Sequence, residues 1–164
     1  MTTVLVTGVT GQDGSLLARR LLDEGHAVHG LLQPGAPVEG WAVGPLAQVV
    51  LHEGDLTDHA RVAEVVASAA PSEVYNLAGQ SSVALSWDDP LATLASTALG
   101  AGGVFEAAYR LQQATGEQVR VVQASSAEIF GQAQQVPQDE QTPLRPVSPY
   151  GVAKAAAHQL ARVY

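Results

Sequence analysis

The sequence has 164 residues, of which 46% are hydrophobic and 15% are charged, a balance typical of one globular domain with a substantial core. The formal net charge is −8, with no run of Lys or Arg, which argues against a nucleic-acid partner. The chain has no cysteine, which excludes disulfides and thiolate metal sites, and its five histidines show no ligand spacing, so no metal site is expected.

Strand and helix patterns alternate along the chain. Short β-branched or apolar runs indicate buried strands, and apolar residues recurring every three or four positions indicate helices. In chain order, we expect a strand at Thr3–Thr7, a helix at Ser15–Glu24, strands at Ala27–Leu32 and Val49–His52, a helix at Arg61–Ala70, a strand at Glu73–Leu77, a helix at Leu91–Thr115, a strand at Val119–Ala124 and a helix at Pro149–Tyr164. The third helix contains Gly100, Gly102 and Gly103, and we expect these glycines to break it.

This order of elements predicts an α/β fold. Strands that alternate with helices form right-handed crossovers, and so a doubly wound parallel sheet of the Rossmann type with helices on both faces. We assign residues 1–164 to one dinucleotide-binding domain. Such sheets usually have six strands, whereas five are expected here, and the last helix reaches Tyr164 without a stop signal. We therefore expect a sheet that is incomplete at its C-terminal end and a substrate domain that is absent from this chain.

A glycine-rich loop joins the first strand to the first helix. It reads Gly8-Val-Thr-Gly11-Gln-Asp-Gly14, in which the first glycine suits a tight turn and the second lets the backbone approach a pyrophosphate. The third lets helix and sheet pack closely, and the helix N-terminus directs free amides at the phosphates. A glycine triplet that serves only as a tight turn is the alternative. Its place between a strand and an amphipathic helix favours dinucleotide binding.

The ends of three further strands bear on the cofactor. The segment Gly30–Gly35, after the second strand, offers neither an acid for a ribose hydroxyl nor an arginine for a 2′-phosphate, so the choice between NAD and NADP stays open. Asp55, after the third strand, is placed to meet the adenine amino group or to cap the next helix, a role that also suits Thr57 or Asp58. The small residues of Leu77–Ser81 permit close approach of a ribose.

Tyr150 and Lys154 are the first candidates for catalysis. They are four residues apart in a predicted helix, which places both side chains on one face. A nearby ammonium favours the phenolate over the phenol, so the tyrosine could exchange a proton with a substrate hydroxyl while a hydride moves to a nicotinamide. Most Tyr-x-x-x-Lys pairs are helix surface, but this one follows a glycine loop and a strand that ends in serines.

The fifth strand leads into the segment Gln123-Ala-Ser-Ser-Ala-Glu-Ile-Phe-Gly131. Its hydroxyls follow the carboxyl end of a strand, where ligands of such sheets lie, and can hold a sugar oxygen. Glu128 is informative because a simple alcohol dehydrogenase has no use for a carboxylate here, whereas removal of a carbon-bound proton beside a carbonyl needs a base. The alternative is an exposed loop glutamate.

The N-terminal segment and the apolar runs of the sequence indicate the cellular compartment to expect. Met1–Thr7 has the pattern of a strand and lacks that of a signal peptide, and no apolar run approaches the ~20 residues needed to span a bilayer. We therefore expect a cytoplasmic protein with no membrane partner.

Six segments together resemble the GDP-mannose 4,6-dehydratases, a family of extended short-chain dehydrogenases. The resemblance is collinear and covers almost the whole chain, and Gln12-Asp13 within the glycine loop is among its more specific marks. Related 4-keto-reductases share part of it. The segments are Thr7–Ser15 (TGVTGQDGS), Gly25–Gly30 (GHAVHG), Gly54–Asp58 (GDLTD), Val74–Val83 (VYNLAGQSSV), Gln123–Gly131 (QASSAEIFG) and Ser148–Lys154 (SPYGVAK).

The resemblance implies an internal redox reaction that converts GDP-mannose to GDP-4-keto-6-deoxymannose. Tyr150 would deprotonate the hydroxyl at sugar carbon 4, Glu128 would take the proton from carbon 5 and help expel water from carbon 6, and Lys154 would orient cofactor and tyrosine. Ser126 stands where the family usually has threonine. The resemblance also implies NADP as cofactor, with NAD as an alternative, and a homo-oligomer. The expected cofactor contacts are Gly8, Thr10, Gly11, Gln12, Asp13, Gly14, Asp55, Leu56, Leu77, Ala78, Gln80, Ser81, Tyr150 and Lys154.

The sequence departs from the family pattern at three places. The arginines that the family carries near Gln33 and Pro34 to hold the NADP phosphate are absent, and Ala92 replaces a family tyrosine. The Ser-Thr-Ser-Glu motif becomes Ser-Ser-Ala-Glu at residues 125–128, a change that sugar-nucleotide epimerases and reductases also tolerate. A 4-keto-reductase or epimerase of the same family and a non-catalytic cofactor-binding fragment therefore stay open as alternatives.

Overall fold

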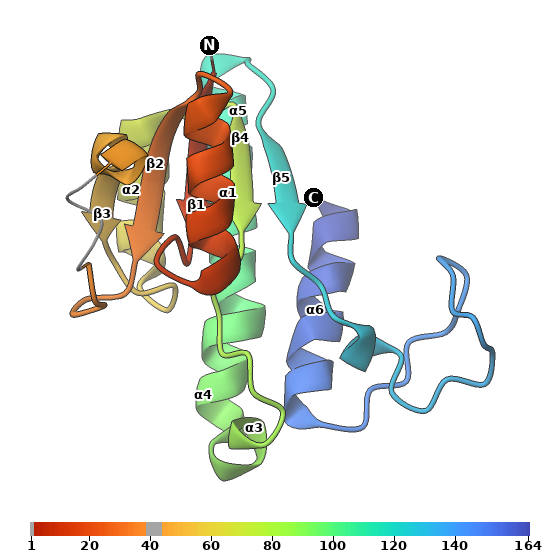
Figure 1. Ribbon diagram of the computed structural model, residues 1–164. Coiled ribbons are helices and arrows are strands. Elements are labelled where there is room, and N and C mark those ends of the chain that lie inside the picture. Colours follow the sequence, from red (N-terminus) through yellow and green to blue (C-terminus); the bar gives the residue numbers. More distant parts are fainter. Residues whose placement is uncertain (1, 39–43) are drawn as a thin grey trace.

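The computed structural model describes residues 2–38 and 44–164, in which five parallel strands form one sheet (Figure 1). The strand order is β3-β2-β1-β4-β5, so the direction of the connections reverses between β1 and β4. The predicted doubly wound parallel sheet is confirmed. The strands are β1 (Thr3–Thr7), β2 (Ala27–Leu32), β3 (Val50–Glu53), β4 (Glu73–Asn76) and β5 (Arg120–Gln123).

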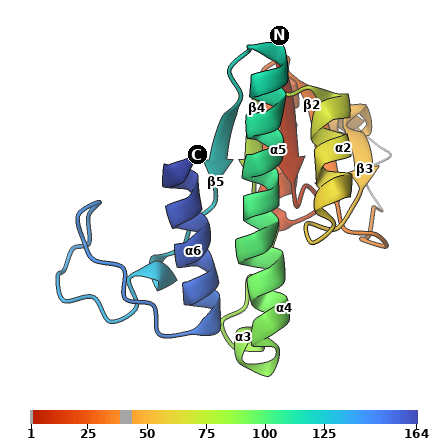
Figure 2. The ribbon, with the colours of Figure 1, turned by 180° about the vertical axis from the view of Figure 1, so that it is seen from behind.

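Helices cover both faces of this sheet (Figures 1 and 2). Helix α1 packs on one face, and α2 and α5 pack side by side on the other, where α6 lies beside α5. The helices are α1 (Gln12–Asp23), α2 (His59–Ala69), α3 (Leu85–Asp88), α4 (Pro90–Leu94), α5 (Gly100–Thr115) and α6 (Pro149–Val163). Two 3₁₀ segments, Gly44–Gln48 and Ala127–Ile129, and the short helix α3 have no counterpart among the predicted elements.

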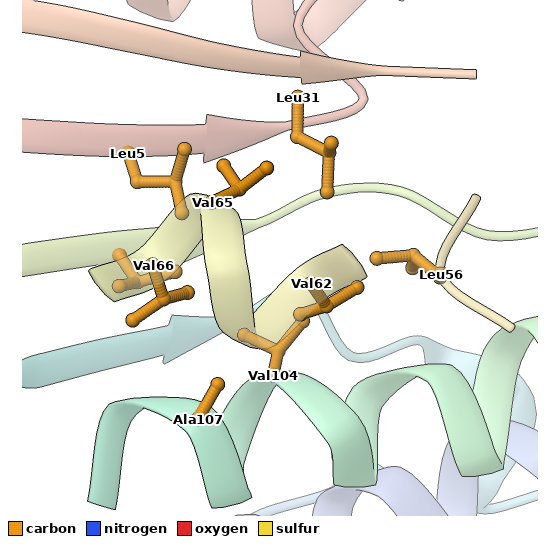
Figure 3. Close-up of a cluster of buried hydrophobic side chains, with 9 residues drawn as sticks. Leu5, Leu31, Leu56, Val62, Val65, Val66, Val104 and Ala107 are labelled. Atoms are coloured by element: carbon orange, nitrogen blue, oxygen red, sulfur yellow. The ribbon is translucent and has the colours of Figure 1, made fainter. Parts of the chain in front are cut away.

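The central strand β1 divides the core into two clusters because successive strand residues point to opposite faces. Val4 and Val6 pack with α1, whereas Leu5 packs on the other face with α2 and α5. Figure 3 shows the second cluster, in which the valines of α2 lie between the sheet and Val104 of α5. Both faces of the sheet are thus buried around β1, which fixes the carboxyl ends of the strands where the glycine loop begins.

The predicted elements differ from the observed ones mainly at their ends. Most bounds shift by one or two residues, which is within the usual uncertainty of helix and strand ends. The larger change is at α1, which begins at Gln12 and not at Ser15. Gly14 therefore lies inside the first turn of the helix, where it packs against the loop that precedes it.

The expected break in the long helix is absent, and this expectation is wrong. α4, a π-helical segment at Ala95–Leu99 and α5 follow one another directly and form one helix over Pro90–Thr115. A Cβ on Gly100 would lie 2.8 Å from the Cβ of Leu56, and one on Gly103 would lie 2.8 Å from His59 Cδ2. These glycines therefore allow close packing against neighbouring segments, and burial of the helix offsets their weak helical propensity.

This continuous helix also corrects the expectation about membrane spans. Its 26 residues reach a mean hydropathy of 1.2 over the best window, so its length and composition would suffice to cross a bilayer. Half of that window is buried within the fold, and the helix packs against α2 and α6. Within this fold it is a core helix that connects β4 to β5.

Candidate functional site

A cavity of about 1110 Å³ opens at the carboxyl ends of the strands, against the glycine loop and the start of α6. This is the place where a doubly wound sheet binds ligands, outside the point at which its strand order reverses. Every residue for which the sequence predicts a cofactor contact lines this cavity. They are Gly8, Thr10, Gly11, Gln12, Asp13, Gly14, Asp55, Leu56, Leu77, Ala78, Gln80, Ser81, Tyr150 and Lys154.

The glycine loop packs so closely against its neighbours that a side chain at Gly8 or Gly14 would not fit. Gly8 has a φ of +66°, and a Cβ there would lie 2.9 Å from the Cα of Ala78, at the end of β4. A Cβ on Gly14 would overlap the carbonyl oxygen of Gly8 and lie 2.8 Å from the Cα of Val9. The loop therefore brings its backbone against both β4 and α1, as a backbone cradle for phosphates requires.

The N-terminus of α1 points into this cradle. Its N-cap is Gly11, which has no side chain to accept hydrogen bonds from the first turn, and Gln12 and Asp13 of that turn line the cavity. A helix of 12 residues presents backbone N–H groups and a partial positive charge at this end. The arrangement suits an anionic pyrophosphate.

A buried chain of hydrogen bonds crosses the sheet beneath the cavity. The Thr7 hydroxyl accepts from the backbone N–H of Ala78 (3.1 Å) and donates to Asn76 Oδ1 (2.6 Å). Asn76 Nδ2 donates to Gln123 Oε1 (2.7 Å), and Gln123 Nε2 donates to the carbonyl oxygen of Ala124 (3.0 Å). Thr7 is 0% and Asn76 is 1% exposed, so the bond between them forms away from water, and the other bonds of the chain are partly buried. They tie the ends of β1, β4 and β5 together and so fix the floor of the cavity.

Tyr150 and Lys154 lie at the start of α6 and both line the cavity. The helix begins at Ser148, whose hydroxyl accepts from the Gly151 N–H (3.0 Å), and Pro149 occupies the first turn, where its missing N–H costs nothing. Lys154 Nζ lies 5.8 Å from the centre of the Tyr150 ring and donates to the carbonyl oxygen of Ala124 (3.0 Å). Burial of the lysine lowers its pKa from the ordinary value.

The two serines after β5 lie in different environments. Ser125 lines the cavity, whereas Ser126 and Glu128 are not among its lining residues. The Ser126 hydroxyl accepts from the N–H of Glu128 (3.2 Å) and so caps the 3₁₀ turn that carries the glutamate. Ser125 Oγ lies 3.3 Å from Nδ1 of His158, two turns along α6 from Tyr150. The sequence pointed to serines at this strand end, but only the fold shows which hydroxyl faces the cavity.

Asp55 does not cap α2, so of its two predicted roles the contact with adenine stays a prediction. The N-cap of α2 is Asp58, which accepts from the N–H of Arg61 (3.0 Å), while Asp55 lines the cavity. Asp55 Oδ1 accepts from the backbone N–H (2.8 Å) and hydroxyl (2.7 Å) of Thr57, and its Oδ2 accepts from Gln33 Nε2 (3.1 Å). Hydrogen bonds from the Thr57 N–H and then its hydroxyl lower the pKa of Asp55, so its carboxylate is ionised at neutral pH.

The long helix supplies lining residues that the sequence did not indicate. Thr93, Ala95 and Ser96 face the cavity where α4 passes into the π-helical segment. Gln80 uses its side chain locally: its Nε2 donates to the carbonyl oxygen of Ser82 (2.7 Å), and its Oε1 accepts from the Ser82 N–H. A helical period of small and hydroxyl-bearing residues was the available signal, but it does not tell a cavity wall from a packing face.

Two histidines, His29 and His52, form a pair outside the cavity. His29 and His52 stack between β2 and β3 with ring centres 5.1 Å apart, and their Nδ1 and Nε2 atoms are 2.9 Å apart. Burial lowers the pKa of both rings. Within residues 2–38 and 44–164, no group of three or more His, Cys, Asp or Glu side chains could hold a metal ion.

Known proteins with similar sequences include several GDP-mannose 4,6-dehydratases. The family model described as GDP-mannose 4,6 dehydratase matches residues 5–164. The chain is 42% identical over 150 residues to a GDP-mannose 4,6-dehydratase of Sordaria araneosa, covering 91% of this chain and 27% of that protein. It is 40% identical over 162 residues to the GDP-mannose 4,6-dehydratase of Sinorhizobium fredii, covering 94% of this chain and 46% of that protein.

A solved structure with the same fold carries ligands. A UDP-glucose-4-epimerase from Stenotrophomonas maltophila, solved with bound NAD and formylated UDP-arabinopyranose, matches with a TM-score of 0.84 and 28% identity. The match covers 99% of this chain and 48% of that one. The chain thus spans less than half the length of each of these relatives.

Proposed function

Because the chain belongs to the GDP-mannose 4,6-dehydratase family, we propose that it forms the cofactor-binding and redox part of a nucleotide-sugar 4,6-dehydratase that acts on GDP-mannose. The observation that carries this proposal is that Tyr150 and Lys154 share one cavity with the glycine loop. These groups come from opposite ends of the sequence, and a cofactor held by the loop would meet the tyrosine only if they line the same space. In the relatives, the part of the protein that this chain does not span would supply further contacts to the sugar nucleotide.

The residues present fit a nicotinamide dinucleotide. A side chain on Gly8 or Gly14 would meet backbone, which leaves their amides as the surface offered to phosphates, and the Gly11 N-cap exposes the first turn of α1. A bound nicotinamide would supply the acceptor and donor of a hydride. The choice between NADP and NAD depends on contacts to the adenosine ribose, at the other side of the cavity from Lys154.

The chain's own residues would manage the proton transfers. The Tyr150 hydroxyl would take the proton of a sugar hydroxyl, with the Lys154 ammonium held nearby by the Ala124 carbonyl. Ser125, which lines the cavity, would hold the oxygen on which charge develops. Glu128 would act as the base that removes a carbon-bound proton, and Ser126 would position it through the cap at 3.2 Å.

A nucleotide-sugar epimerase or 4-keto-reductase is the second candidate. The observation that favours it is the position of Glu128, which is half-buried and outside the residues that line the cavity. An epimerase or reductase needs Ser, Tyr and Lys but no carboxylate base at this position. The two functions therefore differ in what they require of Glu128.

Mass spectrometry of GDP-mannose incubated with the protein and a catalytic amount of dinucleotide tests the proposal. A dehydratase forms a product lighter by one water with no net reduction of the cofactor. A product of unchanged mass that NMR of the same mixture shows to be inverted at one carbon supports the epimerase instead. Glu128→Gln should abolish water loss and leave dinucleotide binding intact, whereas Tyr150→Phe should abolish any conversion. Protein that binds dinucleotide but converts no GDP-mannose contradicts the catalytic part of the proposal alone.

A further inference from the structure

The contact between Gln33 and Asp55 forms one wall of the cavity. Gln33 follows β2 and Asp55 follows β3, so the two side chains meet across the neighbouring ends of these strands. The end of β2 is where dinucleotide-binding sheets hold the adenosine ribose. Neither an acidic residue nor an arginine stands there in this chain, and the Gln33 amide occupies the position.

The partner of Gln33 determines which way its amide faces. An ionised carboxylate can only accept hydrogen bonds, so the amide nitrogen must point to Asp55 Oδ2, at 3.1 Å. Asp55 cannot turn away readily, because Thr57 holds its other oxygen with two hydrogen bonds. Among residues 2–38 and 44–164, no group donates to the side-chain carbonyl oxygen of Gln33, so this oxygen is available as an acceptor. An acceptor suits the hydroxyl of a ribose and has nothing to offer to a phosphate.

The lack of positive charge near Gln33 also disfavours a 2′-phosphate. Residues 21–60 contain neither Lys nor Arg. Among the described residues that line the cavity, Lys154 is the only cation. Its Nζ lies at the end of β5, three strand spacings or about 14 Å from β2. Arg61, at the start of α2, does not line the cavity: its Nε donates to the Glu53 carbonyl at the end of β3 (2.9 Å), and its Nη1 pairs with Glu64 (3.2 Å).

We propose that this site selects NAD over NADP, with the Gln33 carbonyl oxygen, oriented by Asp55, accepting from the ribose 2′-hydroxyl. A 2′-phosphate would place its negative charges beside the Asp55 carboxylate and the Gln33 side-chain carbonyl oxygen, where no described residue that lines the cavity offers a cation. This preference is the reverse of the one that the family resemblance implies. The inference rests on the proposed function, because it concerns the cofactor of the same cavity.

The test is calorimetric titration of the chain with NAD and with NADP at one salt concentration. Two negative charges held a few ångströms from a carboxylate in a solvated site cost about a tenfold loss of affinity, so NAD should bind at least about tenfold more tightly. Equal or tighter binding of NADP overturns this inference and leaves the proposed function standing. Binding of neither dinucleotide by the folded chain overturns both.

Two matched variants locate the effect. Gln33→Arg places a cation between Asp55 and the ribose position, and it should raise the affinity for NADP relative to NAD by about tenfold or more. Gln48→Arg adds the same charge just before β3, at the amino ends of the parallel strands and so at the opposite end from Gln33, and should leave the ratio unchanged. An equal change in both variants would show that the preference reflects net charge and not the contact between Gln33 and Asp55.

Discussion

Lys154 donates its Nζ to the carbonyl oxygen of Ala124 at 3.0 Å, which joins the first turns of α6 to the end of β5. The same oxygen accepts from Gln123 Nε2, the last member of the buried chain that begins at Thr7. The ammonium is thus held by the sheet edge, and the side chain is only 7% exposed. Its position relative to Tyr150 depends on tertiary contacts as much as on helical spacing.

The pKa of Lys154 can be measured directly, because it is the only lysine of the chain. Burial disfavours the charged form, so the lysine should titrate below its ordinary value of 10.5. A ¹⁵N NMR titration of a lysine-labelled sample reports this single side chain without assignment. A midpoint at or above 10.5 would contradict the buried position.

The same shift makes stability depend on pH. Between the folded-state pKa and 10.5, the unfolded chain binds more protons at Lys154 than the folded chain does, so stability should rise with pH through this window. Comparison with Lys154→Met isolates the effect, since other groups titrate in both proteins. The difference in thermal midpoint, wild type minus variant, should increase as the pH approaches 10.5. A difference that stays flat or falls would argue against a desolvated ammonium.

Gly14→Ala should damage both folding and cofactor binding. The new Cβ would overlap the Gly8 carbonyl oxygen, and backbone atoms on both sides cannot rotate away. We expect a loss of about 2–3 kcal/mol in the free energy of unfolding. Gly102→Ala is the control, because its Cβ would meet only Leu160 Cδ1 at 3.5 Å, and it should be neutral or stabilising by up to about 1 kcal/mol. Urea denaturation of the two variants provides the comparison.

The buried chain of hydrogen bonds should be cooperative. Asn76→Ala leaves the Thr7 hydroxyl and the side-chain oxygen Oε1 of Gln123 without their partner and should cost about 2–3 kcal/mol. Thr7→Val should cost about 1–3 kcal/mol, because it orphans the Ala78 N–H. The double variant should lose less than the sum, since both changes break the bond between Thr7 and Asn76. Strict additivity in urea denaturation would show that the two residues act independently.

Thr97→Val should stabilise the protein. The Thr97 hydroxyl is buried in the π-helical segment and finds no hydrogen-bond partner among residues 2–38 and 44–164. Replacing it with a methyl group of similar size removes the cost of desolvation, for a gain of about 1 kcal/mol. Scanning calorimetry should show a higher thermal midpoint than for the wild type. Thr93→Val is the matched contrast and should not stabilise, because that hydroxyl donates to the Asp89 carbonyl (2.9 Å).

Much of the fold follows from local pattern. Each strand of the sheet was predicted at the right place, because short apolar runs between turns report burial on both faces. The glycine loop and the pair Tyr150 and Lys154 were also visible, since the chemistry of each depends on a short spacing along the chain. These features are determined within a few residues of sequence.

Contacts between distant segments decided the rest. The glycines of the long helix do not break it, because Leu56 and His59 pack where side chains would otherwise be. Likewise, neither the choice of Ser125 over Ser126 at the cavity nor the meeting of Gln33 with Asp55 is a property of one segment. The sequence by itself determined the strands, the loop and the pair on α6. Only the tertiary structure decided which side chains face one another, because those distances depend on how the strands are ordered in the sheet.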